Sequence, residues 1–115
     1  MSKLRERIAA NKATRARSKI EVPEWGEGDE PLVIYAGDIT GQDMDRIGRK
    51  HPDFLRNPSM EAQVDMIILK AEDEDGNKHF TLEDKMVMLS EPATLISGIF
   101  ASVFSATSVE EQEKN

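Results

Sequence analysis

The most regular pattern of apolar residues in this chain lies near its C-terminal end. After Ser90 and Pro92, which are typical of a helix start, apolar residues recur in pairs every four positions. These residues are Leu95, Ile96, Ile99, Phe100, Val103 and Phe104. The spacing predicts a helix with one wide apolar face.

The opposite side of this predicted helix is made of small residues. It carries Ser97, Gly98, Ala101, Ser102 and Ser105. Small side chains would let a second backbone come close, and a small domain can turn only one wide face inward. We therefore regard the small-residue side as a candidate self-association surface, with burial in the core as the alternative.

Two further helices are predicted from capping signals. Thr40 followed three residues later by Asp43 approximates a capping box, which predicts a helix over residues 41–50. Thr81 and Asp84 repeat this signal and predict a short helix that ends near Leu89.

The segment after Ser59 fits two structures. Ser59 can cap a helix over residues 60–71, in which Val64 and Ile68 have helical spacing. However, Val64, Met66 and Ile68 also alternate as in a strand. Helix and strand therefore both stay open for this segment.

Two short apolar runs predict a β-hairpin in the N-terminal half. They cover residues 20–25, which Pro23 confines to an edge position, and residues 32–36. The Gly-rich and acidic residues 26–31 between them are predicted to form a loop. Because a two-stranded ribbon is not stable alone, we expect a helix to cover one of its faces.

The first residues of the chain predict a basic helix. Residues 2–18 contain no Gly or Pro, but only Leu4 and Ile8 form an apolar stripe, so we expect this helix to fray until it docks. Residues 1–19 contain seven Lys or Arg and one acid, a balance of +6, whereas the rest of the chain carries −13. The basic segment of one subunit would therefore be attracted to the acidic body of another.

Together these elements predict a mainly helical α+β fold of about five helices with one short hairpin. The 115 residues have room for one domain, and only 5% of them are aromatic, so the core must be mostly aliphatic. We expect a basic helix or mobile arm over residues 1–19, a single helical domain over 20–108 and a disordered tail over 109–115.

Composition excludes several functional classes. Cys is absent, so neither a disulfide nor a thiolate metal site can form, and nothing points to secretion. No segment offers the roughly 20 apolar residues of a membrane span. An acidic body would be repelled by a phosphate backbone. We therefore expect a cytoplasmic protein with neither a membrane nor a nucleic acid as its partner.

Candidate catalytic and metal-binding residues are weak. If Gly76 is aligned with the glycine of a calcium loop, Ala71 and Leu82 occupy both end positions, so a solvated turn is the better interpretation. His51 and His79 are far apart in sequence, and we expect both to be exposed. We expect none of the Asp and Glu residues to lie in an apolar stretch that would raise its pKa. We predict no enzyme, no cofactor and no metal.

Trp25 is the only Trp of the chain and lies on the predicted edge strand. We interpret it as an anchor that packs on the first helix. Contact with a partner is the alternative, because both uses bury the same large side chain.

Several stretches resemble the tail assembly chaperones of long-tailed bacteriophages. In the N-terminal half they are Glu21-Val22-Pro23-Glu24-Trp25-Gly26 and Ile39-Thr40-Gly41. In the C-terminal half they are Asp73-Glu74-Asp75-Gly76-Asn77 with Phe80 and Asp84, a Leu-rich helix, and an Ile/Phe/Ser helix followed by Glu113-Lys114-Asn115. The resemblance covers most of the chain from Leu4 onward.

The resemblance implies a protein of the host cytoplasm that is absent from the finished virion. Several copies would bind the long, helical tape measure protein before tail tube subunits polymerise around it. In many relatives a ribosomal frameshift adds a domain that recruits tail tube protein, and an A-rich run encoding Lys114 and Asn115 would permit one here. The alternatives are a structural connector or tail-completion subunit of the virion and a small nucleic-acid-binding regulator using residues 1–19.

Overall fold

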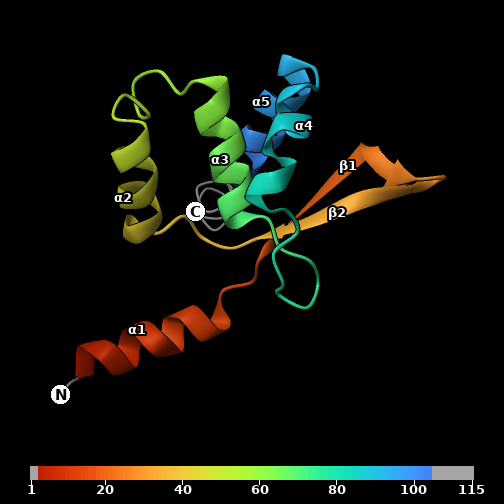
Figure 1. Cartoon of the computed structure of the whole chain (residues 1–115). Helices are drawn as coiled ribbons and strands as arrows, with labels where there is room; N and C mark the ends of the chain where they lie inside the picture. Colours follow the sequence, from red (N-terminus) through yellow and green to blue (C-terminus); the bar gives the residue numbers. More distant parts are fainter. Residues whose placement is uncertain (1–2, 105–115) are drawn as a thin grey trace.

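Five α-helices and one antiparallel hairpin form a mainly helical α+β domain in residues 3–104, the part of the chain that the structure describes. In this computed structural model (Figure 1) the elements in chain order are α1 (Lys3–Thr14), β1 (Ser18–Glu27), β2 (Glu30–Ala36), α2 (Gly41–Lys50), α3 (Met60–Lys70), the 3-10 helix η1 (Leu82–Asp84), α4 (Lys85–Leu89) and α5 (Ala93–Phe104). The predicted fold class is confirmed. Ser105 and the tail predicted over 109–115 lie outside the described residues.

The hairpin is longer than predicted. β1 and β2 pair antiparallel with Ile20 opposite Ile34, but the loop expected over residues 26–31 is wrong, because both strands continue to a two-residue turn. This turn begins at Gly28, whose φ of +56° favours glycine. A Cβ atom at Gly26 would lie 1.9 Å from a carbonyl oxygen of β2, so the strands can approach there only at a glycine.

Both predicted capping boxes are present. The Thr40 hydroxyl accepts a hydrogen bond from the amide of Asp43 (3.1 Å), and the Asp43 carboxylate accepts one from the amide of Thr40 (2.9 Å). Thr81 and Asp84 form the second box, which starts η1 rather than α4 itself. Ser59 caps α3, so the segment that fitted helix or strand is a helix.

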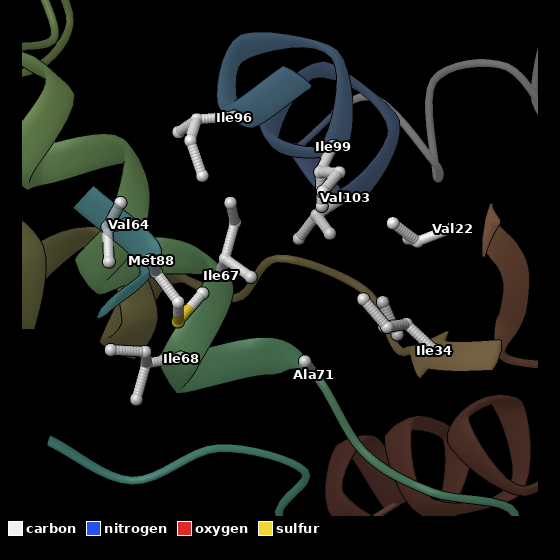
Figure 2. Close-up of a cluster of buried hydrophobic side chains, with 11 residues drawn as sticks. Val22, Ile34, Val64, Ile67, Ile68, Ala71, Met88, Ile96, Ile99 and Val103 are labelled. Carbon is white, nitrogen blue, oxygen red and sulfur yellow. The ribbon is translucent and has the colours of Figure 1, made fainter. Parts of the chain in front are cut away.

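Helix α3 is the centre of the core. Seven of its 11 residues are buried, and Figure 2 shows Ile67 among side chains from α4, α5 and the hairpin. A second cluster joins α2 to α3, where Phe54 packs edge-on against Phe100 (5.8 Å between ring centroids) and Phe104 (5.6 Å). Burying each such side chain contributes roughly 1.5–3 kcal/mol, so these two clusters hold the helices together.

Helix α5 turns one wide face inward, as its spacing predicted. Ile96, Ile99 and Val103 are buried against α3 and the hairpin. None of the helices in residues 3–104 is long and apolar enough to cross a membrane.

Helix α1 extends away from the other helices (Figure 1). It ends at Thr14, earlier than expected, and none of its 12 residues is buried. The residues after it are tied to the body: Arg15 pairs with Asp38 at 2.7 Å, and Arg17 pairs with Glu72 at 3.2 Å. The base of α1 is thus held while the helix itself contributes little to the core.

Candidate partner-binding surface

The short helix α4 and the turn of helix before it carry a group of exposed apolar side chains. α4 has five residues, and after Lys85 all of them are apolar. A helix of less than two turns cannot direct four consecutive apolar residues to one side. Met88 is therefore buried, whereas Leu82 of η1 and Met86 and Val87 of α4 are 69%, 74% and 69% exposed. We call Leu82, Met86 and Val87 the α4 patch.

Two grooves flank the α4 patch. The first has a volume of about 340 Å³ and is lined by residues that include Trp25 and Val87. The second has about 400 Å³ and is lined by residues that include Leu82 and Ile68. Phe80 lines both grooves, so its ring separates them. Together the patch and grooves form a surface with ridges and hollows onto which another apolar surface could pack.

Trp25 belongs to this surface. Its half-buried ring meets the Phe80 ring edge-on at 5.8 Å, and its Nε1–H donates a hydrogen bond to the Glu91 carboxylate. The prediction that Trp25 packs on the first helix is therefore wrong, because its contacts are with Phe80 and Glu91, the residues on either side of η1 and α4. The ring forms part of a groove beside Val87, where it can contact a partner without leaving its position.

His79 fixes the ridge between the two grooves. Its Nε2 lies 2.7 Å from the Val33 carbonyl oxygen, to which an Nε2–H donates, and its ring stacks on Phe80 at 5.4 Å. The prediction that His79 is exposed is wrong, because the turn after α3 lays it across β2.

A cluster of charged side chains between α2, α3 and α4 holds α4, and with it the α4 patch, against the rest of the fold. The Asp65 side chain is 8% exposed and lies 2.7 Å from Nε2 of His51, 3.0 Å from Nζ of Lys85 and 3.3 Å from Nζ of Lys50. Burial alone would raise the pKa of Asp65, but the hydrogen bonds from these three groups together hold it below its ordinary value. Lys85 also pairs with Glu61 at 2.6 Å. The cluster thus ties the first residue of α4 to the middle of α3.

Two predictions about this cluster were wrong. His51 was expected to be exposed, but its side chain is 13% exposed, because it directly follows α2 and meets α3. No carboxylate was expected in an apolar stretch that would raise its pKa, but Asp65 lies between Val64 and Met66 and is buried with them, although its pKa is lowered and not raised. A single acid within an apolar helical run was the signal for it.

A third groove separates β1 from α5. It has a volume of about 440 Å³, and its lining includes Gly98 and Ser102 from the small-residue side of α5. Ala101 is exposed. Ser97 instead faces α3, where its hydroxyl donates to Gln63 Oε1 at 2.9 Å. The structure therefore divides the predicted small-residue side between an internal contact and an open groove.

The two apolar residues predicted on the first helix lie on its surface. Leu4 is 67% and Ile8 is 51% exposed. They lie one helical turn apart on α1 and are distant from the α4 patch in the fold (Figure 1). The predicted site residues therefore form three separate surfaces rather than one.

Neither a metal centre nor a relative guides the assignment of these surfaces. In residues 3–104 no group of three or more His, Asp or Glu side chains is arranged to hold a metal ion. Comparison of the chain with protein family models, curated proteins and solved structures finds no match. The resemblance to tail assembly chaperones stays a prediction, and function must be argued from the surfaces themselves.

Proposed function

We propose that this protein is a tail assembly chaperone that binds the tape measure protein of a long-tailed phage in the host cytoplasm. It acts by binding and not as an enzyme: several copies keep the client soluble until tail tube subunits polymerise, and none stays in the virion. The observation that supports this most is the α4 patch, where three large apolar side chains are exposed beside two grooves.

The shape of this surface suits a helical client. An amphipathic helix presents apolar residues at intervals of three and four positions, and it can lay them into grooves separated by an apolar ridge. Phe80 is such a ridge, and Trp25 and Leu82 line the grooves beside it. The net charge of −7 favours solubility of the complex. Repeated weak contacts along a long client would add up through avidity.

Co-expression with the tape measure protein of the same phage tests this proposal. The wild-type chain is expected to keep the client soluble and to co-purify with it. Val87→Glu is expected to lose both effects, because it places a charge at an exposed residue that lines the groove. Leu55→Glu is the matched control, because Leu55 is 75% exposed but lines neither groove. If the client stays insoluble with the wild type, or if both variants behave alike, the proposal is wrong.

Purified virions separate this proposal from a structural role. Mass spectrometry is expected to find no copies of the chain in finished particles, and stoichiometric copies would instead support a connector or tail-completion subunit.

A longer form would extend the role to the tail tube protein. We propose that frameshifting at the codons for Lys114 and Asn115 adds a domain that recruits it. The coding DNA tests this part, because a slippery run and an overlapping second reading frame must both be present.

A further inference from the structure

Helix α1 has an apolar stripe and basic side chains, and the rest of its own chain leaves the stripe exposed. Leu4 and Ile8 lie one turn apart and more than half exposed. The helix also carries Lys3, Arg5, Arg7 and Lys12 against one acid, Glu6. A short helix of this kind gains stability mainly when its apolar side is covered.

The groove between β1 and α5 has the complementary chemistry. Its apolar lining comes from Ile20 and Val22 of β1 and from residues of α5 that include Ile99. Glu21 and Glu24 lie on its β1 side and are exposed. No Lys or Arg is among its described lining residues. A basic helix with an apolar stripe matches this groove in both charge and polarity.

The spacing of the two surfaces also agrees. Gly98 and Ser102 lie four positions apart on α5, as Leu4 and Ile8 do on α1. Beside Gly98 there is open space, because a Cβ atom added there would meet nothing within 4 Å. A second helix can approach closely at such a position and place larger side chains over it.

The attachment of α1 favours a groove in another copy over the groove of its own chain. Arg15 is held by Asp38, and Arg17 donates to the carbonyl oxygens of Asp73 and Glu74 (2.9 and 2.7 Å). These contacts fix the chain between α1 and β1 and direct α1 away from the body (Figure 1).

We propose that α1 of one copy docks into the β1–α5 groove of the next copy. Leu4 and Ile8 cover Gly98 and Ser102, and the basic residues of α1 face the carboxylates of β1. The contact is heterologous, so an open chain of copies keeps one free helix at one end and one free groove at the other, and assembly continues until a ring closes. It does not depend on the client, but it would supply the several copies that the proposed function needs. One helix buries less than the roughly 1,200 Å² of a standard interface, so each contact is weak.

Sedimentation velocity of the full chain, without client, tests the inference. The wild type is expected to associate as its concentration rises, and to associate less at high salt because the charges are screened. Gly98→Leu fills the groove, and Ile8→Glu places a charge in the apolar stripe of α1. Each is expected to raise the dissociation constant at least about tenfold with an unchanged circular dichroism spectrum. Leu55→Glu, an equally drastic change elsewhere, is expected to associate like the wild type.

A mixture of the two defective variants gives the decisive result. Gly98→Leu keeps an intact helix and Ile8→Glu keeps an intact groove, so together they are expected to form dimers that neither forms alone. A wild type that stays monomeric, defective variants that associate normally, or a mixture without dimers would each overturn the inference. Client binding retained by Val87→Glu, with association intact, would count against the α4 patch alone and leave the docking of α1 standing.

Discussion

Helices α1 and α3 have nearly the same length, 12 and 11 residues, but the fold uses them in opposite ways. Seven residues of α3 are buried, including the polar Gln63 and Asp65, whereas α1 buries none. The comparison shows that residues with good helix propensity are not enough to place a helix in a core. α3 is held by packing on several sides, whereas α1 leaves its surface exposed.

The largest expected effect is on the free energy of unfolding, when the same substitution, Ile to Ala, is made in each of the two helices. Ile67 is completely buried in α3, so Ile67→Ala is expected to lower the free energy of unfolding by about 4 kcal/mol. Ile8→Ala on α1 removes an exposed side chain and is expected to cost less than about 0.5 kcal/mol. Urea denaturation at low protein concentration measures both. Equal losses would show that α1 belongs to the cooperative core.

The next effect concerns the charge inside α3. Asp65→Asn leaves His51 without its carboxylate and Lys85 with Glu61 alone, and it is expected to destabilise the fold by about 3 kcal/mol at pH 7. Because the folded pKa of Asp65 lies below its ordinary value of 3.8, its contribution is present above that pH and disappears as the pH falls through the folded pKa.

Thermal unfolding between pH 7 and pH 2 checks this linkage. The wild type is expected to lose more stability on acidification than Asp65→Asn, which has already lost the contribution. Parallel pH profiles would show that the cluster does not stabilise the fold.

A smaller effect is expected at the cap of α2. Thr40→Ala removes the hydroxyl that accepts from the Asp43 amide and should cost about 1 kcal/mol. Thr40→Ser keeps a hydroxyl and is the control, measured by the same denaturation. A Ser variant as unstable as the Ala variant would point to the Thr methyl group instead.

The smallest effect on stability is expected from deletion of residues 1–14, although this removes a whole helix. The unfolding free energy of the monomer should change by less than about 0.5 kcal/mol, because no side chain of α1 is buried. Arg15 and Arg17 remain in the shortened chain to hold their acidic partners. A loss of several kcal/mol would show that α1 stabilises the fold as α3 does.

Local signals in the sequence predicted local structure well. The Thr40–Asp43 and Thr81–Asp84 pairs marked their helix starts, and the paired apolar positions of α5 predicted its buried face. These signals work because capping and amphipathic burial depend on residues only three or four positions apart.

Features that depend on distant residues were missed. The burial of His51 depends on where α2 meets α3, and that of His79 depends on where the turn after α3 meets β2. The α4 patch had a visible signal, four apolar residues in a very short helix, but its exposure follows from what α3 and α5 leave uncovered. Surfaces are defined by the whole fold, so they were the least predictable part.

The position of Trp25 makes it an intrinsic fluorescent probe of the surface beside α4. It is the only Trp of the chain, so all indole fluorescence originates between the hairpin tip and α4. Its Nε1–H is bound to a carboxylate and its ring lines a groove open to solvent, and indole emission responds to both conditions. A client entering that groove would shift the emission wavelength, so a binding isotherm can be recorded on the unlabelled wild-type protein.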